Sequence, residues 1–285
     1  MFAWIPKPAK KRAKAWLKKL RHTYMSHFHS FGPDDFQAML LRLGLRTGDV
    51  VMVHSSYDRF EGFRGMPADV LRILKDVVGS TGAILMATMP FSGSSQDWAA
   101  QKKILDVNRT PSYMGLLSEL FRRQPGVVRS AHPTHPVAVW GSRKEEIIKD
   151  NHLAKTPCGA GSPFARLLEL RGKVLLLGVT TDSMTYYHFI EELLEPNMPF
   201  SPFSKETFTL QTKDRDGRIL TSELRLMDRQ YSRKRNMKPL TPVLKQNGHW
   251  KEDHVGKLTA ILLDAQDVLD DCQAMAAQGK YCYDA

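Results

Sequence analysis

Blocks of apolar and polar residues alternate along this chain and predict strands and helices in turn. Continuous apolar runs lie at 50–53, 83–86, 137–140 and 174–179. Runs of this length are typical of strands buried on both faces of a parallel sheet. Between them, apolar residues recur at three- and four-residue steps, which predicts helices. We expect these helices within 34–43, 67–78, 114–123, 142–149, 162–170, from His188 onward and within 256–272.

A second pattern follows residue 200. Segments 207–212 and 218–226 flank Asp214-Arg215-Asp216-Gly217, a composition that favours a tight hairpin turn. Residues 89–113 are polar and irregular, which in a compact domain is typical of an active-site loop. The expected fold class is therefore α/β, with a mostly parallel central sheet, helices on both faces and an appended antiparallel hairpin.

Charge divides the chain into a leader, residues 1–33, and a body, residues 34–285. The net charge of the 285-residue chain is +11. The leader holds eight Lys and Arg residues and no acid, which leaves the body at +3. Apolar residues recur at helical spacing among the lysines, so residues 1–25 could form an interfacial helix on anionic lipid or polysaccharide. Alternatively, the leader is a solvated helix that packs on the body or on a partner subunit.

Composition excludes several classes of protein. The apolar runs are too short to span a membrane. The three cysteines, Cys158, Cys272 and Cys282, lack metal-ligand spacing and fit a reducing cytoplasm. The chain has no phosphate-binding loop, no dinucleotide fingerprint, no serine-nucleophile elbow and no metal-ligand motif, and the body lacks the aromatic pattern of nucleic-acid binders. We therefore expect a cytoplasmic protein without a metal site, with peripheral membrane contact left open through the leader.

His188 is the first candidate for chemistry. It follows the apolar run 174–179, and Asp182, Ser183 or Thr185 could cap the helix that carries it. Open α/β sheets place their ligands at the carboxyl ends of strands. A histidine there is a candidate general base, because its pKa lies near neutral pH. The alternative is a hydrogen-bonded histidine with a structural role.

Eight motifs, in order, carry a resemblance that covers about residues 34–272. They are VHSS at 53–56, GAILM at 82–86, TPSYMG at 110–115, RSAHPTHPVA at 129–138, GSPFARL at 161–167, KVLLLGV at 173–179, DSMT at 182–185 followed by His188 and Glu191, and VGKL at 255–258. In these motifs the chain resembles the aminoglycoside 3-N-acetyltransferase family.

The resemblance implies direct transfer of an acetyl group from acetyl-CoA to the amine of an amino sugar, within a ternary complex. His188 occupies the position of the family's catalytic histidine. Glu191, one helical turn further on, and Asp228 are candidates to orient the imidazole or hold the amine. Backbone amides or a hydroxyl near Ser55 and Ser56 could stabilise the oxyanion.

The CoA site implied by the resemblance is formed by three segments that contain hydroxyls, glycine and one arginine. Its candidate residues are His54, Ser55, Ser56, Ser112, Met114, Gly115 and Arg129. His54 and Ser56 could instead cap a turn, and Arg129 could be an ordinary surface residue. For His132 and His135 we favour scaffold hydrogen bonds over a role as base.

The acceptor is expected from the loop at 89–109, with Asp97 and Asp106 as candidates, and from Cys158. Lys102, Lys103 and Arg109 balance the acids of this loop. A loop near charge balance attracts a polycation poorly. We therefore expect an amino sugar linked to a nucleotide, lipid or polysaccharide. The alternatives are an aminoglycoside acceptor, with antibiotic resistance as its consequence, or an inactive, basic, membrane-binding relative. The oligomeric state stays open.

Overall fold

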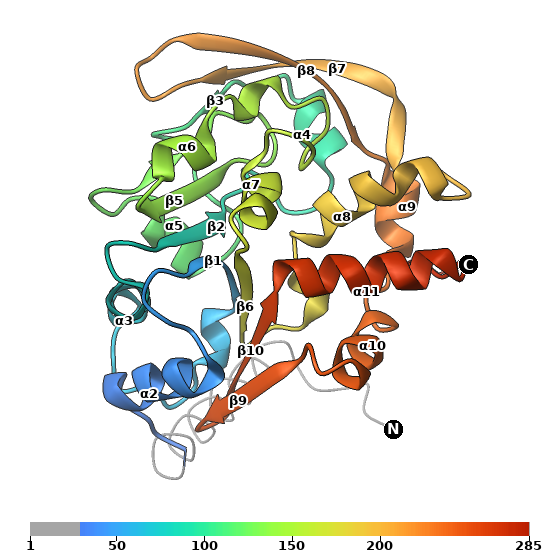
Figure 1. Cartoon of the computed structure of the whole chain (residues 1–285). Coiled ribbons are helices and arrows are strands. Elements are labelled where there is room, and N and C mark those ends of the chain that lie inside the picture. The colour runs from blue at the N-terminus through green and yellow to red at the C-terminus, as the bar shows by residue number, and fades with distance from the viewer. Residues whose placement is uncertain (1–28, 285) are drawn as a thin grey trace, which may run out of the picture.

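The computed structural model describes residues 29–284. A seven-stranded sheet crosses the molecule in the order β4-β5-β2-β1-β6-β10-β9 (Figure 1). Its strands are β1 (Val50–Ser55), β2 (Ala83–Ala87), β4 (Val128–Arg129), β5 (Val137–Gly141), β6 (Lys173–Leu177), β9 (Lys251–Val255) and β10 (Leu258–Asp264). The three central strands run parallel, because β1 pairs in parallel with β2 and with β6. The strands outside them pair antiparallel, β5 and β4 beside β2, and β10 and β9 beside β6.

Both faces of the sheet are covered by helices, as the continuous apolar runs require. Alternate residues of a strand point to opposite faces: Leu175 and Leu177 pack with one core, and Val174 and Leu176 with the other. The first core is closed by α2 (Pro33–Leu43), α3 (Pro67–Val78) and α5 (Leu116–Phe121). The second is closed by α6 (Lys144–Ile148), α7 (Pro163–Glu169), α8 (Tyr187–Leu194), α10 (Leu240–Gln246) and α11 (Ala265–Ala277).

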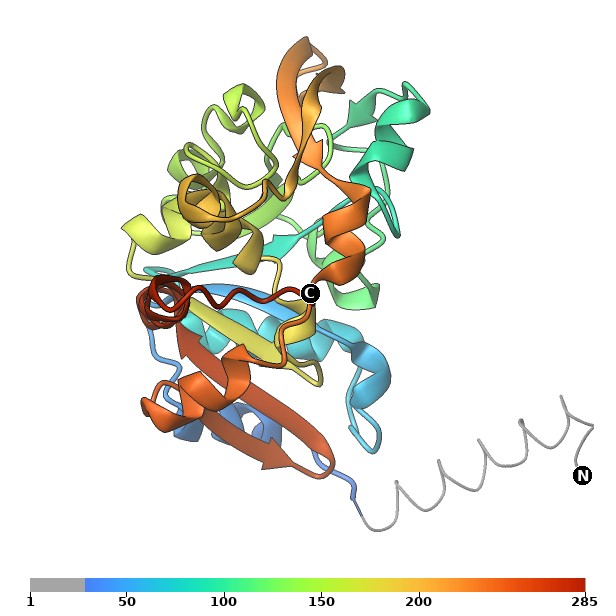
Figure 2. The ribbon, with the colours of Figure 1, turned by 90° about the vertical axis from the view of Figure 1, so that its right-hand side faces the viewer.

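The predicted hairpin arches over one end of the molecule (Figures 1 and 2). It consists of β7 (Phe203–Lys213) and β8 (Ile219–Met227), paired antiparallel, with β3 (Leu105–Asp106) added in parallel to β7. The turn forms at the predicted place, where Asp214 N–H donates to Arg218 O at 2.9 Å. Leu210, Leu224 and Leu226 pack under the hairpin with Ala99. The α/β fold class, with its parallel central strands and appended hairpin, is confirmed.

Two sequence predictions are wrong. Residues 258–264 form β10, not the start of a helix, and α11 begins only at Ala265. Leu262 packs in one core and Leu263 in the other, so pairing with β6 and β9 outweighs the helical spacing. The segment 89–113 is not wholly irregular either, since it contains α4 (Ser95–Ala100) and β3.

The leader prediction lies mostly outside the described residues. The described part of 1–33 joins the body, because Phe31 is buried and its N–H donates to Gly62 O at 3.1 Å. Between residues 29 and 284, no helix combines the length and apolar character needed to cross a membrane.

The central strands predict where a core substitution is costly. Ile84 in β2 is fully buried, whereas Ile219 in β8 is half exposed. We expect Ile84→Ala to lower the free energy of unfolding by about 2–5 kcal/mol, because it removes buried methyl groups and leaves a cavity. Ile219→Ala, the matched control, should change it by less than about 0.5 kcal/mol. Urea denaturation measures both, and equal losses would contradict the assigned core.

Candidate active site

The ends of the parallel strands meet around a cavity of about 370 Å³. Val53, His54 and Ser55 come from the end of β1, and Ala87 from the end of β2. The remaining walls come from the 113–118 segment and the turn after β6, and are formed by Tyr113, Met114, Ser118, Asp182, Ser183 and Thr185. The cavity therefore lies at the sheet edge predicted from the strand pattern.

Of the residues expected to hold CoA, His54, Ser55 and Met114 line this cavity. Gly115 directly precedes α5 and has φ 102°, a conformation that favours glycine. Ser56 N–H is not free to bind an oxyanion, because it donates to Leu177 O at 3.1 Å. The Ser55 side chain remains at the cavity wall.

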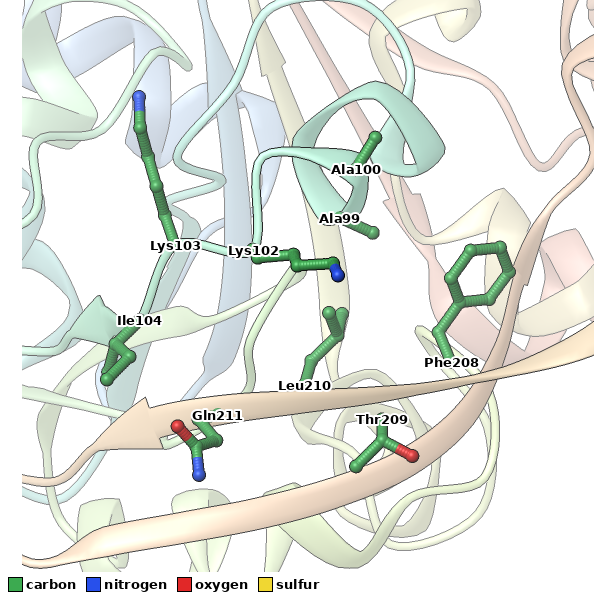
Figure 3. A pocket seen from close by; sticks show the side chains of 9 residues that line it. All are labelled: Ala99, Ala100, Lys102, Lys103, Ile104, Phe208, Thr209, Leu210 and Gln211. Atoms are coloured by element: carbon green, nitrogen blue, oxygen red, sulfur yellow. The ribbon is translucent and has the colours of Figure 1, made fainter.

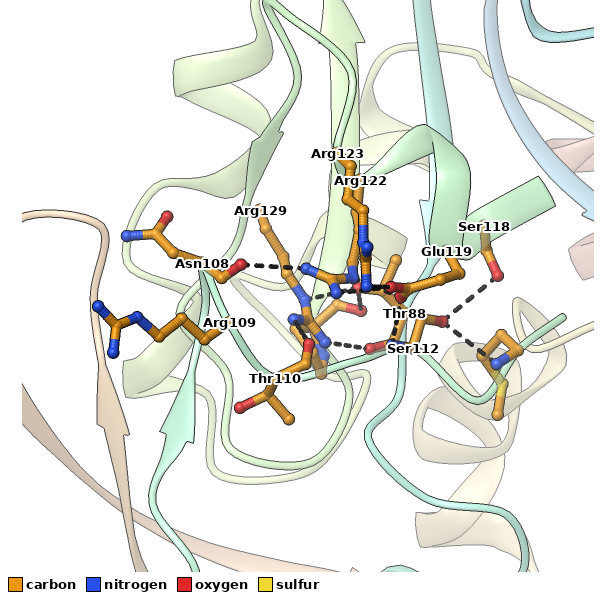
Figure 4. Close-up of polar contacts among 12 residues, drawn as sticks. Thr88, Asn108, Arg109, Thr110, Ser112, Ser118, Glu119, Arg122, Arg123 and Arg129 are labelled. Carbon is orange, nitrogen blue, oxygen red and sulfur yellow. Dashed lines mark hydrogen bonds and ion pairs between the residues drawn. The ribbon is translucent and has the colours of Figure 1, made fainter. Parts of the chain in front are cut away.

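Glu119 of α5 holds Ser112 and the loop that follows it in place (Figure 4). The Glu119 carboxylate accepts the Ser112 N–H at 2.7 Å and also pairs with Arg122 and Arg123. Burial raises the pKa of Glu119, but the hydrogen bonds of Arg122 and Ser112 outweigh it and lower this pKa. Ser112 Oγ in turn accepts the Met114 N–H at 3.2 Å. This network fixes the cavity wall formed by Met114.

Arg129 does not have the environment expected of a CoA phosphate ligand (Figure 4). Its guanidinium is buried and donates to Thr88 Oγ1 at 2.9 Å, to Thr88 O at 2.5 Å and to Thr110 O at 2.6 Å. Since protein oxygens occupy these donors, the predicted phosphate contact is not supported. Arg129 instead ties the end of β2 to the loop at 107–110.

His188 lies at the second residue of α8, with its side chain 18% exposed. The predicted caps are absent: Thr181–Ser183 forms a 3-10 turn, and Tyr186 precedes the helix without a capping side chain. His188 Nδ1 lies 2.9 Å from Glu191 Oε2. Because a carboxylate accepts, Nδ1 carries the proton, and Nε2 has a free lone pair. Burial, and then the charge of Arg235, lower the pKa of His188, whereas Glu191 raises it.

Glu191 is completely buried and has two further partners that the sequence did not indicate. Arg235 Nε and Nη2 donate to its two oxygens at 2.5 and 3.0 Å, and the Tyr283 hydroxyl donates at 2.5 Å. Burial raises the pKa of Glu191, but His188 and Arg235 lower it to about 2. Glu191 is therefore an anion at neutral pH.

Three more histidines lie in this region: His135 and His54 near His188, and His132 behind His135. The His135 ring lies 6.3 Å from it, and the ring of His132 lies 6.2 Å from that of His135. His132 Nδ1 accepts the N–H of His135 at 2.9 Å, which agrees with a scaffold role. His54 is 7% exposed, and its Nε2 has no hydrogen-bond partner in the protein. Burial, and then the charge of His188, lower the pKa of His54 to about 4.

A model of the family described as aminoglycoside 3-N-acetyltransferase matches residues 52–277. The chain belongs to this family. The match covers both strand ends of the cavity, the His188–Glu191 pair and Arg235. The resemblance seen in the sequence motifs is confirmed.

Individual relatives agree with this assignment. The chain is 33% identical over 169 residues to aminoglycoside N(3)-acetyltransferase VII of Streptomyces paromomycinus, an alignment that covers 55% of this chain and 58% of the relative. The crystal structure of aminoglycoside acetyltransferase AAC(3)-Xa has a TM-score of 0.75 and 27% identity, covering 89% of this chain and 95% of that one. A structure titled AAC-IIIb binary with CoASH shares the fold, with a TM-score of 0.74, 21% identity and coverage of 90% and 99%.

Other predicted residues lie elsewhere. Asp228 does not contact His188; it caps α9 (Arg229–Lys234) by accepting the Gln230 N–H at 2.7 Å. Cys158 is fully buried in a hydrophobic core and cannot line an acceptor pocket.

The two acids of the 89–109 loop also have partners in the protein. Asp97 is exposed and forms an ion pair with Arg229 at 2.5 Å. Asp106 accepts the N–H groups of Asn108 and Arg109 at 2.9 and 3.0 Å. These contacts account for the presence of both acids in the loop without a role in binding the acceptor.

The same loop borders a second cavity, of about 530 Å³, under the hairpin (Figure 3). Its walls come from residues 99–104 and 208–211. Figure 3 shows the Lys102 side chain lying across the apolar floor near Leu210, with Lys103 pointing away from it. With two lysines and no acid, these walls do not favour a polycation. Among residues 29–284, no three His, Cys, Asp or Glu side chains are grouped to hold a metal ion.

The buried histidines predict how stability depends on pH. Burial lowers the pKa of His54 and of His188, and it lowers the pKa of His132 to about 3 and that of His135 well below 6.5. Below pH ~6.5 the unfolded chain therefore binds protons that the folded chain excludes. We expect the free energy of unfolding to fall as the pH drops from 7 to 5, by up to about 1.4 kcal/mol per pH unit for each histidine.

Urea denaturation across this pH range measures the slope of the free energy of unfolding against pH. His132→Asn should reduce that slope by the contribution of about one proton. The raised pKa of His249, which donates to Asp271, and the pKa of buried Glu192, raised to about 8, act in the opposite direction, but the four histidines outnumber these two groups. A stability that stays constant or rises between pH 7 and 5 would contradict the neutral, buried state of these histidines.

Proposed function

We propose that this protein transfers an acetyl group from acetyl-CoA to the amine of an amino sugar, with His188 as the general base. One observation carries the proposal: a buried carboxylate holds His188 Nδ1 at 2.9 Å, three residues after Thr185, which lines the cavity, and near enough to His54 of the same cavity for its charge to lower the pKa of His54. A helix residue with this partner at this place is poorly explained by packing alone. Family membership supports the same reaction.

The chemistry follows from the protonation state of His188. An amine reaches the site as an ammonium ion and must lose a proton before it can attack. Glu191 fixes the Nδ1–H tautomer, which leaves the Nε2 lone pair of His188 to take that proton. The amine nitrogen then bonds to the thioester carbon and the carbon–sulfur bond breaks. The proton held by His188 passes to the CoA thiolate, and the second N–H proton of the new amide leaves to solvent, so the products are the amide, CoA thiol and one proton. Because burial lowers the pKa of His188, its imidazole is neutral and able to act as a base near pH 7.

For acetyl-CoA we propose the cavity at the ends of β1 and β2. The fold relative titled as a binary complex with CoASH is consistent with such a ligand. Residues 54–56 and 112–115 would contact CoA, and Ser55 is the remaining candidate among the predicted oxyanion donors, since the Ser56 amide is occupied. We place this reaction in the cytoplasm, which suits three free cysteines.

For the acceptor we propose an aminoglycoside. The names of the family and of the relatives support this choice over an amino sugar linked to a nucleotide, lipid or polysaccharide, for which no comparison speaks. The charge of the 89–109 loop was the basis for the other expectation. That loop is a weak guide, because Asp97 and Asp106 already have partners in the protein. The intact His188–Glu191 pair argues against an inactive relative.

Replacement of the base gives the first test. We expect His188→Ala to lower kcat for acetyl transfer by ~10² to 10⁴, the range for a lost acid–base group, with little change in the affinity for acetyl-CoA. His254→Ala, which alters an exposed histidine of β9, is the control. Release of CoA thiol measures turnover, and calorimetry measures binding. Turnover of His188→Ala within a few-fold of the wild-type rate would refute the assignment.

The acceptor needs a separate test. Purified protein with acetyl-CoA should release CoA thiol in the presence of gentamicin-type aminoglycosides, and expression should raise their minimum inhibitory concentration. The control panel contains nucleotide-linked amino sugars and glucosamine. If only compounds of the control panel are acetylated, the acceptor is one of those amino sugars and not an aminoglycoside. If none of the acceptors tested is acetylated, the proposed activity is contradicted.

A further inference from the structure

The carboxylate of Glu191 is held by residues from two other parts of the chain. Arg235 follows α9 and Tyr283 follows α11, yet both donate to the Glu191 oxygens. His188 contacts only one of these oxygens, Oε2, which Arg235 Nη2 shares at 3.0 Å. The other oxygen, Oε1, is bound by Arg235 Nε and the Tyr283 hydroxyl.

Arg235 and Tyr283 are themselves neighbours in an antiparallel bridge. Asn236 N–H donates to Cys282 O at 2.9 Å, and Asp284 N–H donates to Lys234 O at 2.7 Å. Side chains directly opposite each other in such a bridge point to the same side, here toward Glu191. Figure 2 shows the segment after α11, drawn in dark red, running up to the orange helix α9.

The Tyr283 ring is also fixed by packing. Phe200 meets it edge to face at 5.0 Å, and the Arg235 guanidinium lies 5.7 Å from its centre. Both donors therefore reach Glu191 with little freedom to move.

We propose that Arg235 and Tyr283 form a clamp on Glu191 that sets both the place of its carboxylate and the net charge that His188 meets. The two are positioning residues for acetyl transfer, and this role rests on the proposed function. Their hydrogen bonds reach the carboxylate and not the imidazole, so Tyr283 acts through Glu191, whereas Arg235 also acts on His188 through its charge.

The clamp solves an electrostatic problem for a histidine base. A buried carboxylate alone would favour imidazolium, which cannot accept a proton. Arg235 supplies the compensating charge, and its effect on the pKa of His188 opposes that of Glu191. The other groups near the pair add little charge of their own. His54 and His135 are held neutral by burial, and burial raises the pKa of Glu192 to about 8.

Three buried thiols also interact electrostatically with Glu191. Burial raises the pKa of Cys158, Cys272 and Cys282, and the charge of Glu191 raises it further, so all three stay neutral. Arg235 is thus the cation that decides the charge beside His188.

Tyr283→Phe tests the clamp with the least disturbance, because it removes one hydroxyl and keeps the ring. We expect kcat to fall by about 3- to 30-fold, as expected when acid–base geometry is loosened, with an unchanged KM for acetyl-CoA. The acidic limb of the kcat/KM profile should move to higher pH, because Glu191 loses a donor and stabilises imidazolium more. Tyr281→Phe is the matched control: its hydroxyl donates to Asn197 O at 2.8 Å, away from Glu191.

Arg235→Met removes the cation and should shift the acidic limb further than Tyr283→Phe does. Arg235→Lys restores the charge without the two-pronged contact, so the limb should return toward that of wild type while kcat stays low. If Arg235 and Tyr283 served only the stability of the fold, the acidic limbs of the three variants would not shift in this order.

An NMR titration of the His188 imidazole measures the effect of the clamp on the pKa of His188 without any acetyl transfer. The His188 signal is identified by its loss in His188→Ala, and its pKa should rise from wild type to Tyr283→Phe to Arg235→Met. If these pKa shifts occur but the protein acetylates no acceptor, the proposed function is contradicted and the clamp on Glu191 still holds. The opposite outcome is also possible: acetyl transfer depends on His188, but Tyr283→Phe and Tyr281→Phe have the same His188 titration and the same pH profile of kcat/KM. That result would overturn the clamp and keep the proposed function.

Discussion

One buried negative charge, on Glu191, ties three separate parts of the chain together. An ionised carboxylate without exposure to water must be paired and hydrogen-bonded, or the fold loses several kcal/mol. Here the partners come from α8, from the residue after α9 and from the segment after α11. Three distant parts of the chain therefore have to meet at one point. The same requirement that stabilises the fold also gives His188 its tautomer and its orientation.

The sheet explains why that point lies beside a cavity. β1 and β6 are parallel neighbours, so the chain leaves both strands at the same edge. His54 and Ser55 end the first strand, and the turn at Thr181–Ser183 follows the second. Because helices cover both faces, this edge is where the interior of the sheet meets solvent. A ligand there reaches the strand ends and the turn that leads into α8 together.

Short-range patterns explain what could be predicted from the sequence. The central strands, the hairpin turn at Asp214 and the helical place of His188 depend on local periodicity, and the structure contains all of them. The helix expected from 256 failed because the residues of β10 also fit a helical repeat, and only pairing with β6 and β9 distinguishes the two. Glu191 was a candidate because it lies one turn from His188. Arg235 and Tyr283 were missed, since 44 and 92 residues separate them from their partner.

Charged candidates were the least predictable. Arg129 was a candidate to bind CoA, Asp97 and Asp106 to bind the acceptor, and Asp228 to orient the imidazole or hold the amine, yet each has a partner within the protein. A sequence shows that a charge is present but not whether it is already satisfied. Burial decides this, and burial depends on contacts between distant residues.

The shared carboxylate also has a consequence for sequence drift. A chain that loses Arg235 alone keeps an uncompensated buried anion, and a chain that loses Glu191 alone keeps an uncompensated buried cation. Neither single step is neutral, whereas a joint replacement by apolar side chains could be tolerated by the fold. Among natural variants, positions 191 and 235 should therefore change together or not at all, and variants that change both should no longer be under selection to keep His188.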